Sequence, residues 1–340
     1  MIGLCQGAFG MNKSNVKTAP FIHGSEVSLN LHLDLLIGLL SVMIISVVQN
    51  GFRVLSICLF SAFAAWLTET LGQIITRRHG KTDFRSLAMG LIIAMLCPVT
   101  IPLWVPVSAS VISVLFVRII LGPNYKTLFM TPVIAWIYML TVAPMDMTSY
   151  PANRFFNAFP PFENINREFY LVTDSIAQQL QSKQVLTYNF LDIFTGNYPG
   201  GMGTTCIFII LAVCVYFIFR RSMAWQVSLS MIITVSIFAL LFNRTSQSPL
   251  FSVLYELSAT SYIFVAVFVA GDLINTPTLV GAKIVFGALV GIFTMTFRYI
   301  GLAEYCVPFS LLICNLFCEM FDVLFLYIQI FFLRKRMIKK

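Results

Sequence analysis

Two aspartates that interrupt apolar stretches are the residues of this chain best suited to do chemistry. Asp272 directly follows an apolar run that ends at Gly271, and Asp322 lies within the last apolar run of the sequence. Acidic residues are costly in the hydrocarbon of a membrane and usually mark an ion or proton path there. We therefore expect Asp272 and Asp322 to line the path of a cation, Na+ or H+. A helix cap or an ion pair is the alternative role for each carboxylate, and Arg298 is the expected counter-charge. Two further acids, Asp34 and Glu256, are expected at the membrane interfaces, where water solvates them.

A glycine-rich turn at residues 199–205 is the second candidate site. It has glycine at positions 200, 201 and 203, ends in Thr204 and Thr205, and precedes an apolar run. The N-terminus of a helix behind such a turn can bind an anion, because its backbone N–H groups are unpaired and its dipole is positive. A plain helix start that is capped by a threonine hydroxyl explains the same residues.

The sequence predicts neither a metal site nor nucleic-acid binding. None of the eight cysteines forms a CxxC pair, and the three histidines, His23, His32 and His79, lie far apart. Cys314 and Cys318 have the spacing of part of an iron–sulfur site, but most of the cysteines lie in apolar runs, where a thiol acts as a small hydrophobe. The basic residues are scattered and form no dense arm of the kind that binds nucleic acid.

The composition shows which elements must position these residues. Of the 340 residues, 58% are hydrophobic and only 11% are charged, which excludes an ordinary soluble domain. A helix needs about 20 apolar residues to cross about 30 Å of hydrocarbon. We therefore predict an all-α polytopic membrane protein with about ten transmembrane segments, counting the run 86–117 as two segments that divide at Pro98 and Pro102. The apolar runs are 34–53, 54–76, 86–117, 127–145, 205–219, 222–243, 257–271, 284–297 and 305–333.

The basic residues predict the orientation of these segments. With the C-terminal tail inside, 16 of the 22 Lys and Arg residues fall on the cytoplasmic side and 6 outside, as the positive-inside rule requires. Both termini are then cytoplasmic. The chain divides into a cytoplasmic N-terminal segment (1–28), a first transmembrane repeat (29–143), an extracytoplasmic loop (144–202), a second repeat (203–333) and a basic cytoplasmic tail (334–340).

Two of the predicted segments are too short to span. The run 86–97 stops before Pro98 and would be about 18 Å long as a helix, and the run 257–271 would be about 22 Å long. Similar prolines, Pro132 and Pro308, follow each break, so we interpret the chain as two inverted five-segment repeats with broken half-helices. Such paired breaks place a ligand site near the membrane midplane. Two proline kinks in a packed bundle are the alternative.

Several motifs occur in the same order as in the RnfD/NqrB family, the flavin-bearing membrane subunits of Rnf electron-transport complexes and of sodium-pumping NADH:quinone reductase. Residues 199–205 resemble the family's PGSxGET turn, 90–104 resemble GLL…PPTLPLW, and 270–277 resemble ATDPVTTP. The resemblance implies a bound flavin (FMN or riboflavin), partner subunits of an Rnf-type complex, Na+ or H+ as the transported ion, and the bilayer of a bacterial inner membrane. It assigns the flavin to Gly200, Gly201, Gly203, Thr204, Thr276 and Arg298.

The chain departs from the family at the position that matters most for the flavin. Members carry FMN esterified to a threonine in the motif TDGxSGAT, and the matching stretch here is 173–180, with Leu180 at the acceptor position. Leucine has no hydroxyl group and cannot form the phosphoester. We therefore predict that covalent FMN is lost and that any flavin would be held without a covalent bond.

Two functions are consistent with this resemblance. In the first, the chain is a subunit of an ion-translocating electron-transport complex rather than a catalyst on its own. It then either passes electrons through a non-covalent flavin or only supports its partner subunits. In the second, the same broken-helix scaffold works alone as a channel or transporter for a small solute, such as a flavin.

Overall fold

The computed structural model describes residues 25–76, 84–121, 130–151, 172–182, 188–244 and 248–338, with side chains from residue 30 to 331. Within these ranges the regular structure is helical apart from one short antiparallel ribbon, in which Tyr150 lies opposite Thr173. The elements are α1 (Ser25–Asn50), α2 (Arg53–Ile75), α3 (Arg85–Leu96), α4 (Trp104–Val114), a π-helical turn (Leu115–Ile120), α5 (Thr131–Val142), α6 (Pro144–Thr148), β1 (Tyr150–Pro151), β2 (Val172–Thr173), α7 (Ile176–Gln181), α8 (Phe190–Thr195), α9 (Ile207–Arg220), α10 (Trp225–Leu241), α11 (Pro249–Ser258), a 3-10 turn (Ala259–Ser261), α12 (Tyr262–Phe268), α13 (Val280–Ile300), α14 (Cys306–Leu316) and α15 (Cys318–Ile338).

The prediction of an all-α membrane fold is confirmed. Four helical stretches in the described part are long and apolar enough to cross a bilayer by themselves: Asn30–Asn50, Arg53–Ile75, Pro249–Phe268 and Val280–Ile300. Helices α14 and α15 meet at a bend of 50° and add a fifth if they form one span. The other apolar helices, such as α3 and α9, have 10–17 residues. Ten spans and the inverted repeat therefore stay predictions.

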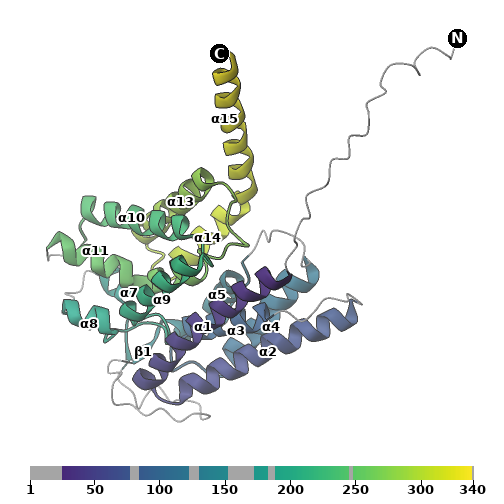
Figure 1. Cartoon of the computed structure of the whole chain (residues 1–340). Coiled ribbons are helices and arrows are strands. Elements are labelled where there is room, and N and C mark those ends of the chain that lie inside the picture. Colours follow the sequence, from purple (N-terminus) through teal and green to yellow (C-terminus); the bar gives the residue numbers. More distant parts are fainter. Residues whose placement is uncertain are drawn as a thin grey trace.

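The helices form two groups that lie side by side (Figure 1). In the N-terminal group, α1–α5, helix α2 packs on α3 and α4. In the C-terminal group, α9–α15, helix α10 packs on α11 and α13. Contacts of α1 with α9 and of α5 with α14 join the two groups, while α15 projects from the C-terminal group. Each group thus packs around one central helix.

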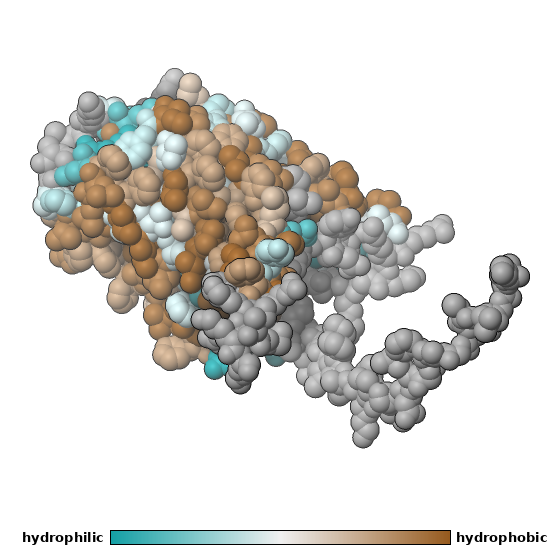
Figure 2. Space-filling view, turned by 90° about the horizontal axis from the view of Figure 1, so that it is seen from above, coloured by the Kyte–Doolittle hydropathy of each residue, from teal (hydrophilic) through white to brown (hydrophobic). Residues whose placement is uncertain are grey.

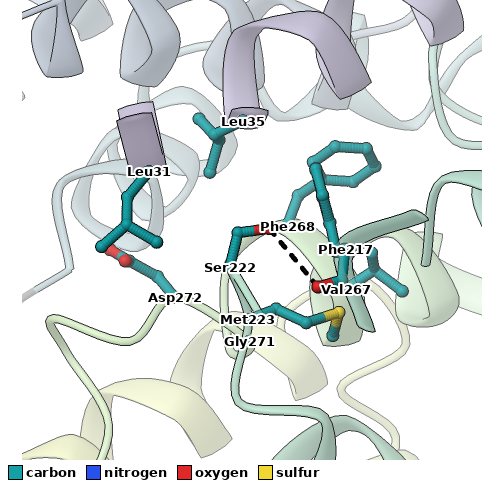
Figure 3. Close-up of a pocket in the computed structure, with 9 residues that line it drawn as sticks. All are labelled: Leu31, Leu35, Phe217, Ser222, Met223, Val267, Phe268, Gly271 and Asp272. Carbon is teal, nitrogen blue, oxygen red and sulfur yellow. Dashed lines mark hydrogen bonds between the residues drawn. The ribbon is translucent and has the colours of Figure 1, made fainter. Parts of the chain in front are cut away.

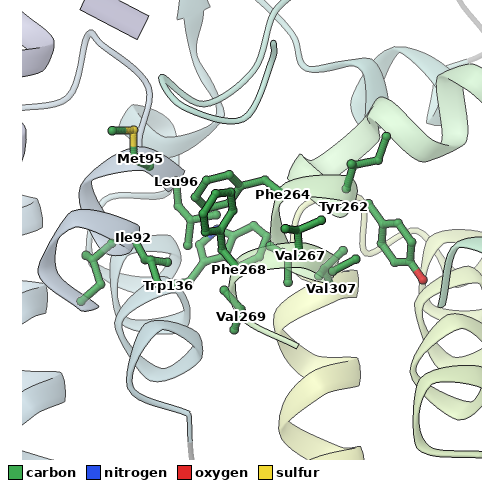
Figure 4. Packing of buried hydrophobic residues seen from close by; sticks show 14 of the residues in the cluster. Ile92, Met95, Leu96, Trp136, Tyr262, Phe264, Val267, Phe268, Val269 and Val307 are labelled. Carbon is green, nitrogen blue, oxygen red and sulfur yellow. The ribbon is translucent and has the colours of Figure 1, made fainter. Parts of the chain in front are cut away.

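The core lies where the two groups meet, and α12 is at its centre. All seven residues of α12 are buried. The rings of Phe264 and Phe268 lie 4.7 Å apart, next to Leu96 and Trp136 of the N-terminal group (Figure 4). A helix that is apolar on every side is stable only when it is buried on every side. This explains why α12 is surrounded by both groups.

The outside of the molecule is also apolar. Large side chains such as Val48, Ile75 and Phe219 are 75%, 79% and 83% exposed. In Figure 2 apolar side chains cover most of the visible face, with polar ones gathered mainly toward one edge. Monomeric soluble proteins rarely expose apolar patches of this extent. The surface is suited to contact with lipid.

Candidate functional site

Asp272 lies in a break between α12 and α13, residues 269–279, close to the place that the sequence predicts. Its carboxylate accepts hydrogen bonds from the side chain of Asn275 (3.2 Å) and from the backbone N–H of Ile274 (3.2 Å). It also forms an ion pair with Arg85, at 3.2 Å between Nη2 and Oδ2. Arg85 is the first residue of α3, so this ion pair joins the two helical groups.

Asp322 reaches the same break from α15. Its carboxylate accepts the backbone N–H of Thr278 at 2.9 Å and that of Leu279 at 3.2 Å, directly before α13 begins. A carboxylate at this place balances the positive end of the helix dipole and satisfies N–H groups that have no partner within the helix. The structure thus brings Asp272 and Asp322 to one break, and the contacts described for them are those of an ion pair and a helix cap.

Arg298 does not lie beside these aspartates, although the sequence suggested it as their counter-charge. It is on the last turn of α13, about 27 Å along the helix from Val280. Its guanidinium donates to the carboxylate of Glu256 at 2.7 Å and to the backbone carbonyl of Ala259 at 2.9 Å. Only 2% of the Arg298 side chain and 1% of the Glu256 side chain are exposed, so the expectation that Glu256 is solvated at an interface is wrong.

The carbonyl group that Arg298 binds belongs to a break that the sequence did not predict. Thr260 and Ser261 adopt left-handed backbone angles, with φ of 53° and 55°, between α11 and α12. Residues with a side chain avoid this region because Cβ approaches the following carbonyl oxygen. The hydroxyl of Ser261 donates to Thr204 Oγ1 at 2.9 Å. The break contains neither glycine nor proline, so only the isolated charges of Glu256 and Arg298 could have signalled it.

The glycine-rich turn packs against the end of α3. The backbone N–H groups of Met202 and Gly203 donate to the carbonyl oxygens of Cys97 (2.8 Å) and Met95 (3.0 Å). A Cβ atom on Gly203 would lie 2.2 Å from the sulfur of Met95, so only glycine allows this approach. The structure therefore explains the glycine by packing, without a bound anion.

A buried arginine, Arg53, holds the break that follows α3, residues 97–103. Its side chain is fully buried at the start of α2. Its Nε and Nη2 atoms donate to the carbonyl oxygens of Val99 (2.8 Å) and Ile101 (2.9 Å). Sequence reasoning placed Arg53 on the outer surface and missed this role. A lone charge at the border of a long apolar run was the available signal.

Thr276 lies apart from the other residues that the resemblance assigns to a flavin. Thr204 meets Ser261 near the 259–261 turn, and Arg298 binds the same turn. Thr276 lies in the 269–279 break, beyond the opposite end of α13. Thr204 and Arg298 therefore lie at one turn, and only the assignment of Thr276 to the same flavin site does not fit the structure.

Position 180 does not fit covalently bound FMN. Leu180 lies in α7 with only 4% of its side chain exposed, packed in the hydrophobic core. Ser175 caps the helix and its hydroxyl contacts the buried carboxyl of Glu304. The pKa of Glu304 is raised, because the effect of burial outweighs the Ser175 hydrogen bond and the charge of Arg298, which both act to lower it. Of the neighbouring threonines, Thr195 lies on α8, outside any such motif, and Thr187 lies outside the described residues.

A small pocket borders Asp272 (Figure 3). Its free volume is about 10 Å³, room for about one water-sized particle and far below the roughly 300–1,000 Å³ of ordinary ligand sites. Asp272 is the one charged residue among the described residues that line it. The others are Leu31, Leu35, Phe217, Ser222, Met223, Val267, Phe268 and Gly271.

The described residues include no group of three or more His, Cys, Asp or Glu side chains that could hold a metal ion. Cys314 and Cys318 belong to different helices, α14 and α15, which meet at 50°. The helix face that they were expected to share is therefore absent, and the suggestion of a partial iron–sulfur site has no support. His23 and His79 lie outside the described residues.

Comparison with known proteins adds an independent line of evidence. Residues 15–328 match the model of the NQR2, RnfD, RnfE family. Relatives described as a subunit of an ion-translocating oxidoreductase complex include proteins from Haemophilus ducreyi (23% identical), Actinobacillus succinogenes (23%) and Haemophilus influenzae strain PittEE (24%). Each alignment covers 90% of this chain and 94–95% of the relative. The similarity therefore extends over nearly the whole of both chains.

Proposed function

Because the chain belongs to the NQR2, RnfD, RnfE family, we propose that it is an integral membrane subunit of an ion-translocating oxidoreductase complex in a bacterial inner membrane. The observation that carries this proposal is the near full-length similarity to relatives described as subunits of such a complex. The apolar helices and the apolar outer surface support a place within the bilayer. The alternative of a stand-alone channel is not favoured, because these relatives are described as parts of a complex.

We infer that the chain works without covalent FMN at position 180. Leu180 offers no hydroxyl group, and its side chain is buried in α7. Any flavin that the chain binds is therefore held by non-covalent contacts.

We infer that the cation path passes the 269–279 break. Support comes from the meeting of Asp272 and Asp322 there and from the pocket beside Asp272. The side chains of Asp272 and Arg85 are 13% and 15% exposed, whereas that of Glu256 is 1% exposed. A cation from solution can therefore reach Asp272 more easily than Glu256. Na+ and H+ are the candidate ions.

The assembly and its activity can be tested in the native bacterium. The chain is tagged at its C-terminus and purified from membranes in mild detergent, and ion uptake driven by electron transfer is measured in vesicles with and without the gene. We expect the tagged chain to copurify in a stable complex with redox activity, and we expect deletion to abolish redox-driven uptake until the gene is restored. A chain that migrates alone, in a strain whose uptake is unchanged by deletion, would support the stand-alone channel instead.

Topology is tested separately. We propose ten spans in two inverted repeats, with both termini cytoplasmic. Single cysteines at positions 164 and 337, in a chain otherwise free of accessible cysteines, are treated with an impermeant thiol reagent. In intact cells we expect labelling at position 164 and none at 337. Labelling at 337 would reverse or dismantle this topology.

A further inference from the structure

We propose that Arg85 is a built-in counter-ion that competes with the translocated cation for Asp272. This inference rests on the proposed function and adds to it a residue that sets the affinity of the ion path. Arg85 begins α3 of the N-terminal group, and Asp272 follows α12 of the C-terminal group. Their ion pair is 3.2 Å long and partly accessible, with 15% and 13% of the side chains exposed.

The carboxylate of Asp272 keeps neutral partners when Arg85 leaves. Asn275 Nδ2 donates to Oδ2, the oxygen that Arg85 binds, and the N–H of Ile274 donates to Oδ1. These donors hold the carboxylate in place without cancelling its charge. The negative charge therefore stays available, and a mobile cation can take over the role that Arg85 fills here.

The pocket beside Asp272 supplies the space for this exchange. Its wall is mostly apolar, and the carboxylate is its charged group among the described residues (Figure 3). With about 10 Å³ of free volume, the pocket is too small for a flavin and has room for about one water-sized particle, such as a dehydrated Na+. A carboxylate at the wall of an apolar pocket attracts a cation more strongly than a carboxylate in water does, because the effective dielectric constant is lower there.

Other ion pairs in the described part of the chain do not combine a contact between the two groups with a place at this pocket. Asp34 of α1 and Arg220 of α9 also join the two groups, at 3.1 Å, but neither residue lines the pocket. Glu256 and Arg298 are nearly inaccessible and both belong to the C-terminal group. Glu69 and Arg118 form a pair of 2.7 Å with 5% and 12% of the side chains exposed, but both belong to the N-terminal group. Arg118 therefore provides a control that matches Arg85 in charge and in burial.

Release of Arg85 would also act at a distance. Helix α3 extends about 18 Å from Arg85 to its C-terminal end. At that end, the carbonyl oxygens of Met95 and Cys97 bind Gly203 and Met202 of the glycine-rich turn. Helix α3 thus connects the site of cation exchange to the 97–103 break. When a cation occupies Asp272, the N-terminal end of α3 loses its ion pair.

The experiment uses the intact complex in proteoliposomes, with Na+ as the probe and redox-driven turnover as the readout. Loss of the competing charge in Arg85→Gln should lower the half-saturating Na+ concentration by about fivefold, in keeping with the strength of a partly exposed ion pair. Arg85→Lys keeps the charge but not the planar contact, so we expect a smaller shift in the same direction. Arg118→Gln should leave the half-saturating concentration unchanged.

Two results would overturn the role of Arg85. One is an unchanged half-saturating concentration in Arg85→Gln or, if that variant does not insert, in Arg85→Lys. The other is an equal shift in Arg118→Gln, which would indicate a general effect of charge. Wild-type turnover that drives transport without any dependence on Na+ also removes this inference and leaves the proposed function intact. Failure of the complex to transport ions at all removes the proposed function itself.

Discussion

The 97–103 break and the 269–279 break both follow a short buried helix, but they are built from different groups. The first contains no acidic residue, and its carbonyl oxygens are bound by Arg53 and by backbone N–H groups of the glycine-rich turn. The second contains Asp272 and receives Asp322, whose carboxylates are bound by N–H groups and Arg85. Under the proposal above, a mobile cation replaces the partly exposed Arg85 at the second break, whereas the fully buried Arg53 stays bound at the first.

The two breaks are also linked by α9. The turn before α9 donates from Met202 to Cys97 at the first break, and the residue Ala224 after α9 donates to Gly271 at the second, at 2.8 and 2.9 Å. Backbone groups exposed at membrane depth must find partners within the protein. If a cation exchanges with Arg85 as proposed, the 269–279 break is the adjustable one, whereas the 97–103 break, held by the buried Arg53, is the rigid one. Helices α3 and α9 connect the two breaks.

The largest effect is expected when the rigid break loses its arginine. Arg53→Met removes the donors to the carbonyls of Val99 and Ile101, and each buried polar group left unsatisfied costs about 1–3 kcal/mol, so the two losses together exceed a single one. We expect a clear fall in the thermal unfolding midpoint of the purified protein, compared with Lys283→Met on α13. An unchanged midpoint would mean that helix packing alone holds this break.

A smaller effect on stability is expected at the glycine-rich turn. In Gly203→Ala the new methyl group would lie 2.2 Å from the sulfur and 2.8 Å from the Cβ atom of Met95. Overpacking of this kind costs about 1–3 kcal/mol, measured again as the unfolding midpoint. The double variant with Met95→Ala should recover part of the loss relative to the sum of the single variants. If the losses of the two single variants simply add in the double variant, the predicted clash between position 203 and Met95 would be contradicted.

The adjustable break is tested by neutralising its carboxylates. Asp272→Asn should reduce ion-dependent turnover by about tenfold, equivalent to about 1.4 kcal/mol in activation free energy. Asparagine caps helices about as well as aspartate, so we expect Asp322→Asn to insert and fold while showing a similar defect. Asp34→Asn, which neutralises a buried acid paired with Arg220 outside the break, is the control. Normal ion dependence in both test variants would remove the ion path from this break.

The smallest effect concerns covalent flavin, for which no signal is expected. Without a hydroxyl at Leu180, the purified protein should show no fluorescent flavin band on a denaturing gel, even when a flavin transferase is co-expressed. A fluorescent band, with mass spectrometry placing FMN on Thr187 or Thr195, would show that the loop is aligned wrongly. It would also place a redox group in the loop before α9, on the side of the 97–103 break, whereas the carboxylates lie at the 269–279 break.

Much of the fold and part of the candidate site could be predicted from local sequence. Pro98 has no backbone N–H and cannot continue α3, so the first break was evident. The stretch from Gly271 to Pro277 indicated the second break, and Asp272 stood out because charge is rare in apolar runs. The 259–261 turn was missed because Thr260 and Ser261 adopt left-handed angles only under the contacts of Thr204 and Ala303.

The sequence by itself determined the helical membrane architecture, because hydropathy and the distribution of charge depend on residue type alone. It also determined that position 180 cannot carry a phosphoester. Only the tertiary structure decided the partners of the charges. Arg85 and Asp272 are 187 positions apart, and Arg298 binds Glu256 rather than either aspartate. Ion pairs depend on distances of a few ångströms between distant segments, and packing of the two helical groups sets those distances.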